Sequence, residues 1–345
     1  MNIMKAYAEV ALILDKLNYN ALFDGFRRYR FALYAGSEIV IDGRSMPYSS
    51  EFMGNTSIMF EGEYIAIWNM ESDPVEDVER LAYCLVHEMF HCHQRANDEK
   101  RYPSDLDLLM YPDDIENYNA KYNENRYLAD AYENRDIECL KKFASIRAGR
   151  FARYPFMVHQ EMKAETLEGM AEYIGLKALK QIAPEKYEAA VEDYLIKLRA
   201  DSGLLFDIRR ISYFAGTIYF LCLDEFGFAV RNAFDPDKTA YEQNNINTDG
   251  VTAEISKYDF IGKQYAEIMD SRTAELQEHM ARSEYTECYA VIYGYDPMNI
   301  FRVGDIIYCR HFVFLETKDG MKPIYSAAAL KLAEGSVKEV VGYYV

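Results

Sequence analysis

The sequence predicts a mostly helical α+β protein, and three observations carry this prediction. Half of the 345 residues are hydrophobic, which is enough for a sizeable core. Through the middle of the chain, apolar residues recur at helical spacing. Before residue 70 and after residue 284, β-branched and aromatic runs are instead typical of strands. We therefore expect one domain over residues 1–284 and a small β-rich module over residues 285–345.

The N-terminal part is predicted to contain a helix and a small β-sheet over about residues 28–70. Acidic residues interrupt the apolar stretch of residues 1–18, which indicates an amphipathic helix and not a signal peptide. Residues 38–42 and 56–68 have the composition of strands. Within the second run, Glu61-Gly62 predicts the turn of a β-hairpin.

The most specific feature follows this sheet: His87, Glu88 and His91 complete an HExxH motif. Two histidines four residues apart share one face of a helix, where both rings can reach one metal ion. The glutamate between them then lies near the open coordination position of the metal, where it can serve as a general base. The alternative is a pair of hydrogen-bonded histidines that never bind metal.

The motif is predicted to lie on a helix over about residues 74–94. Asp73 is the expected N-cap, Pro74 the first helical residue and Glu76 the closing residue of a capping box. Apolar residues then recur at steps of three and four: Val75, Val78, Ala82, Leu85 and Met89. At about 100° per residue, the motif histidines fall roughly opposite this stripe, so they are expected on the floor of a cleft.

A hydrolytic zinc ion usually has three protein ligands, so a third ligand is needed. Gln94 and Asn97 stand where a metzincin would have glycine and histidine, and this excludes the metzincin pattern. Downstream, Glu168 begins a Glu-Gly-x-Ala segment within a predicted helix over about residues 160–180. This segment, after HExxH, resembles the signature of the gluzincins, zinc metallopeptidases of the aminopeptidase N-like and thermolysin-like groups.

The resemblance implies a zincin-like catalytic domain in which His87, His91 and Glu168 hold Zn²⁺. It also implies that Glu172, one helical turn further on, accepts the free ring N–H of His87. The 77-residue interval between His91 and Glu168 is longer than in those groups and implies inserted helices. Glu165 shares a helix face with Glu168 and is the competing third ligand.

A second segment resembles the same family. Tyr213 and Gly216 form a Tyr-x-x-Gly segment like the one that follows the third ligand in aminopeptidase N-like enzymes, where the tyrosine stabilises the tetrahedral intermediate. This implies that Tyr213 is catalytic beside Glu88. The alternatives are a core tyrosine at this position and His159 in the same role. In gluzincins, moreover, a sheet precedes the zinc helix and its edge strand binds the substrate backbone.

The remaining helices are read from periodicity. Residues 99–125 are polar and predict an exposed connection with helical pieces. Helices are expected over residues 124–150, 185–199 and 209–226, the last of them ending at Gly227. In the C-terminal module, strands are expected over these ranges: 289–293, 305–314 and 337–345.

Composition limits the partners. The net charge of −18 argues against nucleic acid and against anionic membrane surfaces, and no apolar run approaches membrane-spanning length. The six cysteines lack CxxC pairing, which favours free thiols and a cytoplasmic location. Cys309 and His311 with Cys288 match no zinc module. The sequence does not indicate the oligomeric state.

Together these features predict a zinc-dependent metallohydrolase, specifically a peptidase that acts on a peptide or protein substrate. Glu88 would take a proton from the attacking water and deliver it to the leaving amine. The alternative is a non-proteolytic zinc-binding protein of the same fold that acts in partner binding. A third reading is an interaction protein whose C-terminal module binds the partner. His93 would not be a fourth ligand. It lies two residues after His91, and a side chain at that spacing points away from the helix face that carries His87 and His91.

Overall fold

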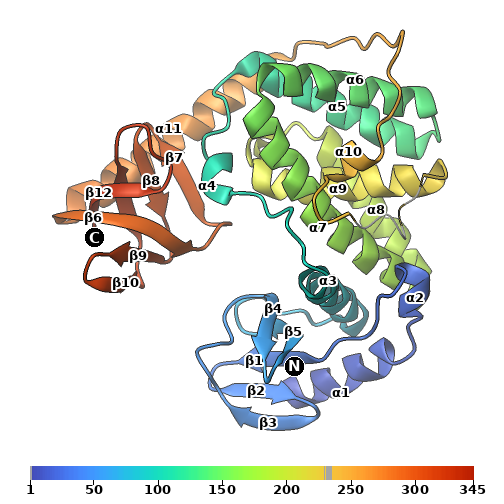
Figure 1. Cartoon of the computed structure of the whole chain (residues 1–345), viewed down its shortest axis with the longest axis horizontal. Coiled ribbons are helices and arrows are strands. Elements are labelled where there is room, and N and C mark those ends of the chain that lie inside the picture. The colour runs from blue at the N-terminus through green and yellow to red at the C-terminus, as the bar shows by residue number, and fades with distance from the viewer. Residues whose placement is uncertain (1, 229, 231–234) are drawn as a thin grey trace.

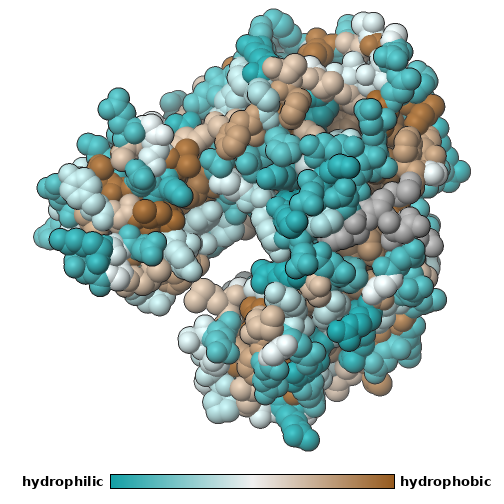
Figure 2. Space-filling view, in the orientation of Figure 1, coloured by the Kyte–Doolittle hydropathy of each residue, from teal (hydrophilic) through white to brown (hydrophobic). Residues whose placement is uncertain are grey.

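The computed structural model describes residues 2–228, 230 and 235–345 and confirms the α+β prediction (Figure 1). An N-terminal lobe, a helical body and a C-terminal β module form an open arc. Figure 2 shows that a deep opening on the viewed face separates the N-terminal lobe from the C-terminal module. No described helix combines the length and the apolar character that a membrane span requires.

The N-terminal lobe is a five-stranded sheet packed on helices. Its elements are α1 (Ile3–Leu14), α2 (Tyr19–Leu22), β1 (Phe31–Ala35), β2 (Glu38–Ile41), β3 (Arg44–Pro47), β4 (Thr56–Phe60) and β5 (Glu63–Asn69), with the strand order β3-β2-β1-β5-β4. The predicted hairpin is confirmed: β4 pairs antiparallel with β5, and both Glu61 and Gly62 adopt the positive φ of its turn. β1 and β3 were not predicted as strands.

The motif helix is α3 (Val78–Ala96), and its predicted start was wrong. Asp77 is the N-cap and accepts hydrogen bonds from the backbone N–H groups of Glu79 and Arg80. Asp73 instead closes a turn after β5, where its carbonyl accepts from the indole of Trp68. Because Asp73 belongs to this turn, the helix starts four residues later than predicted, after the N-cap Asp77. The apolar stripe from Ala82 to Met89 is buried as predicted.

The helical body contains α4 (Asp105–Leu108), α5 (Ile115–Glu133), α6 (Ile137–Arg153), α7 (Pro155–Ile182), α8 (Pro184–Arg199), η1 (Gly203–Phe206), α9 (Ile208–Glu225), α10 (Ala240–Gln243) and α11 (Asp259–Arg282). The predicted helix over residues 124–150 is two helices, because Arg135 takes a positive φ and Asp136 caps α6. The prediction of an exposed connection over residues 99–125 was wrong for its second half, where α5 begins. There α5 buries its polar side chains among charged partners. At the end of α9, Gly227 takes the positive φ of a helix terminus.

Two glycines bring α7 and α9 into close contact. A Cβ on Gly169 would lie 2.5 Å from the backbone of Gly216, and a Cβ on Gly216 would lie 2.1 Å from the carbonyl oxygen of Glu165. Neither position has room for a side chain. The two helices can therefore cross backbone to backbone directly beside Glu168 and Tyr213.

The C-terminal module is an antiparallel seven-stranded sheet. Its strands are β6 (Tyr285–Tyr295), β7 (Ile300–Val303), β8 (Ile306–Cys309), β9 (Val313–Thr317), β10 (Gly320–Ile324), β11 (Ala328–Leu332) and β12 (Glu339–Tyr344), in the order β10-β9-β6-β12-β11-β8-β7. Leu106 of α4 is buried in the core of its inner face, where Leu109 and Met110 also pack. β6 begins directly after the predicted boundary at residue 284. Whether residues 1–284 and 285–345 fold separately stays a prediction.

Candidate metal centre

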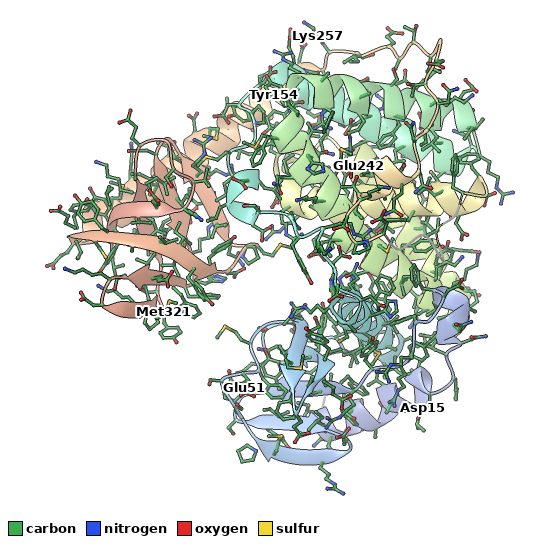
Figure 3. All side chains as sticks on the ribbon, in the orientation of Figure 1. Asp15, Glu51, Tyr154, Glu242, Lys257 and Met321 are labelled. Carbon is green, nitrogen blue, oxygen red and sulfur yellow. The ribbon has the colours of Figure 1, made fainter. Side chains whose placement is uncertain are left out.

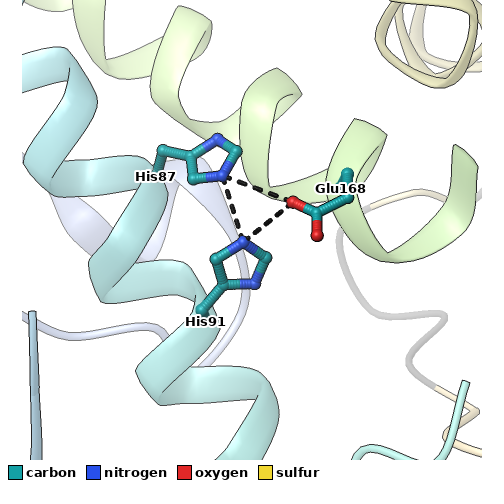
Figure 4. A group of neighbouring side chains, drawn as sticks. All are labelled: His87, His91 and Glu168. Atoms are coloured by element: carbon teal, nitrogen blue, oxygen red, sulfur yellow. Dashed lines mark hydrogen bonds and ion pairs between the residues drawn. The ribbon is translucent and has the colours of Figure 1, made fainter. Parts of the chain in front are cut away.

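Three side chains from two helices meet at one point (Figure 4). His87 and His91 come from α3, and Glu168 comes from α7. The two histidine Nε2 atoms are 3.0 Å apart, and Glu168 Oε2 lies 3.1 Å from Nε2 of His91 and 3.6 Å from Nε2 of His87. Ligand atoms about 2.0–2.1 Å from a tetrahedral zinc ion are about 3.3 Å from one another. The three atoms therefore have the spacing of one face of such a tetrahedron.

Both imidazole rings are oriented from behind. Nδ1 of His87 lies 2.7 Å from Oε2 of Glu172, and Nδ1 of His91 lies 2.7 Å from Oε1 of Gln94. The Gln94 amide is fixed in turn, because its Nε2 donates to the Leu167 carbonyl over 3.1 Å. Since both Nδ1 atoms face acceptors, a neutral ring at either position carries its proton on Nδ1 and keeps the lone pair of Nε2 free. These are the two atoms that point at Glu168.

Two tyrosines anchor Glu172. The hydroxyl groups of Tyr83, on α3, and Tyr194, on α8, both donate to its Oε1. Burial raises the pKa of Glu172 to about 7, and the hydrogen bond from Tyr194 opposes that rise. One carboxylate oxygen thus accepts from the two tyrosines, and the other faces Nδ1 of His87. This position allows Glu172 to orient the His87 ring.

Glu168 is held by an arginine. Nη2 of Arg209, on α9, donates to its Oε1 over 2.7 Å, while Nε of Arg209 lies 3.1 Å from Oδ1 of Asp105. Burial alone would raise the pKa of Glu168, but the charge of Arg209, aided by His91, holds it well below the usual value. Glu168 is therefore an ionised carboxylate with one oxygen anchored and the other directed at the histidines.

Glu88, the middle residue of the motif, is also buried. Burial raises its pKa, and the neighbouring His87 and His91 oppose this rise. A carboxylate with a raised pKa is a stronger proton acceptor than a free one, which suits the role of a general base.

Tyr213 lies on the other side of the site. Its ring stacks on that of His87 at 6.1 Å with an interplanar angle of 8°, and the guanidinium of Arg209 lies 5.4 Å from its centre. Burial, followed by the charge of Glu168, raises its pKa well above the usual value, so the hydroxyl stays protonated and able to donate. The structure brings Tyr213 to the site, and its catalytic role stays a prediction.

The other candidates lie apart from this group. Glu165 is fully buried against cations of α5 and α6. His159 lies 3.5 Å from Glu242 of α10, and Figure 3 labels Glu242 in the helical body. His93 packs against the rings of Phe23, Phe26 and Phe90. Among the described residues, the group that can hold a metal is therefore His87, His91 and Glu168.

Sequence reasoning missed the residues that support the ligands. Arg209, Tyr83 and Gln94 were not assigned to the site, although each lies three or four residues from a predicted site residue on the same helix. That spacing places side chains on one helix face, and it is the signal that could have found them. Asp105 and Tyr194 come from other elements, so spacing carries no such signal for them.

Comparisons with family models, curated proteins and solved structures found no match for this chain. The resemblance to gluzincins therefore rests on the two motifs and on the geometry into which they fold. That geometry is a buried His-His-Glu group that can hold a metal ion.

Proposed function

We propose that this protein is a zinc-dependent metallohydrolase, and specifically a peptidase. The observation that carries the proposal is the site itself. Two imidazole Nε2 atoms and one carboxylate oxygen stand at tetrahedral spacing, and the general base of the motif is buried beside them. Two histidines and one glutamate are the ligand set of hydrolytic zinc sites, which leave a fourth position open. Structural zinc sites need neither an open position nor a general base.

The side chains have separate roles in this proposal. Bound zinc would supply Lewis-acid activation of water and of the scissile carbonyl. Glu88 takes the proton of the attacking water on a carboxylate oxygen and passes it to the nitrogen of the leaving amine. The Tyr213 hydroxyl donates a hydrogen bond to the developing oxyanion. Glu172 and Gln94 keep both histidines in the tautomer that leaves Nε2 free.

A peptide substrate is supported by the neighbouring sheet. β4 is an edge strand of the N-terminal sheet and is paired on one side, with β5. Because α3 packs against both strands, this edge lies beside the helix that carries the motif. An edge strand offers unpaired N–H and C=O groups to an extended chain. We infer that the substrate backbone pairs with residues Thr56–Phe60.

The test uses a diverse peptide library digested in parallel by the wild-type protein and by Glu88→Gln, with products read by mass spectrometry. Zinc content is measured on both proteins and should be about one ion per chain. Glu88→Gln keeps the zinc and the fold but cannot accept the proton, so turnover should fall by about 10²–10⁴. Tyr213→Phe should keep the zinc and lose about 2–4 kcal/mol of transition-state stabilisation.

Two results would reject the proposal. Absence of zinc after growth with added zinc, together with no binding on titration, removes the metal centre. Indistinguishable digests from two fully zinc-loaded proteins remove the peptidase activity. The second result favours a non-proteolytic zinc protein that binds a partner.

A further inference from the structure

The sheet of the C-terminal module is covered on only half of its outer face. α11 packs over β7, β8 and β11, where Leu276 and Met280 contact the buried cluster around Phe301 and Tyr308. The other half consists of β6, β9, β10 and most of β12. α11 reaches β12 at Tyr344, whose carbonyl oxygen lies 3.3 Å from Nε2 of His279, and no described helix packs extensively on the rest (Figure 1). The outermost strand, β10, ends the sheet at the lower margin of the module, where Met321 is labelled (Figure 3).

This open half carries aromatic rings. Tyr285 lies on the α11 side of the sheet, where its ring packs at 4.9 Å from that of Tyr344. Further along β6, Ala290 and Ile292 are buried in the core of the inner face, so the residues beside them project to the outer side. Among these are Tyr289 and Tyr293, which are 73% and 68% exposed. Across β9, Phe314 contacts the ring of Tyr325, which is 74% exposed. Exposed aromatic groups gathered on one face are typical of a binding surface.

Three carboxylates lie among these rings. In the strand register, Val291 pairs with Glu316 on one side and with Glu339 on the other, while Glu287 lies two pairs further along the same face of β6. All three glutamates are exposed, and none forms an ion pair with a described lysine or arginine. We define the aromatic–acidic face by the following residues: Tyr285, Glu287, Tyr289, Tyr293, Phe314, Glu316, Tyr325 and Glu339.

The charges and rings of the aromatic–acidic face favour one kind of binding partner over others. An apolar partner would remove three carboxylates from water without giving them a counter-charge, which is costly. A second copy of the same face would oppose like charges, and nucleic acid would be repelled by them. A cationic side chain suits both components, because it pairs with a carboxylate and is attracted to the face of a tyrosine ring.

We propose that the aromatic–acidic face binds an extended protein segment with arginine or lysine at alternate positions. Same-side residues of an extended chain are about 6.8 Å apart. Such a chain can therefore place alternate side chains along the series Glu287, Tyr289 and Val291 of β6, where the pairing with β12 is irregular between Glu287 and Ala290. Lys331, opposite Gly342 on the neighbouring strand, marks the border of the face toward α11. The surface is separate from the metal centre, so the proposal does not depend on hydrolysis.

The probe is a fluorescent peptide of about eight residues, roughly 27 Å when extended, that alternates arginine and serine. Binding to the full-length protein is followed by fluorescence anisotropy at low and at physiological ionic strength. The comparison peptides replace arginine with glutamate or with leucine. The arginine peptide should bind, and its affinity should fall as salt increases.

Two variants locate the binding. The first variant combines three substitutions: Glu287→Gln, Glu316→Gln and Glu339→Gln. The second combines Tyr289→Ser with Tyr293→Ser. Each variant should weaken binding of the arginine peptide at least about fivefold. The matched control changes three exposed and unpaired glutamates of α8, as Glu185→Gln, Glu188→Gln and Glu192→Gln. It removes the same charge from a surface without this set of rings and should change affinity by less than about twofold. Because all of these positions are exposed, each variant should keep the wild-type melting temperature.

Three outcomes would overturn the proposal. The first is an equal loss of affinity in the α8 control, because binding would then follow net charge alone. The others are an affinity unchanged by the two tyrosine substitutions, and equal or tighter binding of the glutamate or leucine peptide. Equal binding by zinc-loaded and zinc-free protein is the expected result. It separates this proposal from that of the metallopeptidase.

Discussion

One helix, α7, carries two pairs of buried glutamates whose environments differ. Glu161 and Glu165 are enclosed by Lys121, Arg147 and Arg150, whereas Glu168 and Glu172 face imidazole and phenol groups. All four residues are at most 6% exposed, so burial does not distinguish them. What differs is the number of fixed cations around each carboxylate.

In the first pair the oxygen atoms are already satisfied. Arg147 lies 2.6 Å from Oε2 of Glu165, and Lys121 lies 3.4 Å from its Oε1. Glu168 has a single arginine, which occupies Oε1 and leaves Oε2 to the histidines. A carboxylate surrounded by cations supports the fold. A carboxylate with one oxygen anchored can also bind a metal, and this comparison favours Glu168 over Glu165 as the third ligand.

The largest expected effect tests this assignment directly. Glu168→Ala removes an anionic ligand, so zinc affinity should fall by more than the roughly 100-fold that is typical for loss of an outer partner. Glu165→Ala should leave the zinc affinity of the folded protein within a few-fold. Zinc titration with a competing chelator measures both. A larger loss of zinc affinity in Glu165→Ala than in Glu168→Ala would show that Glu165 is the third ligand.

The second prediction concerns stability. Arg147→Met leaves Glu124 and Glu165 without their main counter-charge in a fully buried network, so the free energy of unfolding should drop by about 3–5 kcal/mol. The control is Arg135→Met, which breaks an exposed ion pair with Glu225 and should cost less than about 1 kcal/mol. Chemical denaturation compares them. Similar losses would mean that the network around Glu165 is no more important than a surface pair.

The same comparison explains what the sequence could predict. The HExxH motif was found because its chemistry depends on spacing within one helix, and Glu168 was found because its Glu-Gly-x-Ala segment resembles the gluzincin signature. The polar stretch that includes Lys121 and Glu124 was misread as an exposed connection, since composition alone cannot tell solvated charges from mutually neutralised ones. Its partners Arg147 and Glu161 lie on other helices, so only the packing of α5, α6 and α7 reveals that these charges are buried.

A third prediction sharpens the role of the second pair. Glu172→Gln should weaken zinc binding by about 10–100-fold, because an amide oxygen is a weaker acceptor for the ring N–H of His87 than a carboxylate oxygen. Tyr83→Phe should have a smaller effect, since Tyr194 still donates to the same oxygen. Both affinities come from the same chelator competition. An affinity unchanged by Glu172→Gln would mean that packing alone orients His87.

The smallest expected effect extends the comparison to two faces of α3. His87 and His91 face polar partners, whereas His93 is buried among phenylalanine rings, and this burial, with a contribution from Arg27, lowers its pKa to about 4. In the unfolded chain its pKa is near 6.5. Between these values the unfolded state binds a proton that the folded state does not, so stability is lost as the pH falls from about 6.5 toward 4.

His93→Leu removes this proton uptake and should flatten the pH dependence. At pH 5 the wild-type protein should have lost about 1–2 kcal/mol more than the variant, each relative to its own stability at pH 8. Denaturation across this pH range measures the difference, and the subtraction cancels the contributions of all other titratable groups, which both proteins share. Parallel curves would mean that His93 is protonated in the folded state. Burial among the phenylalanine rings would then not change the protonation of His93.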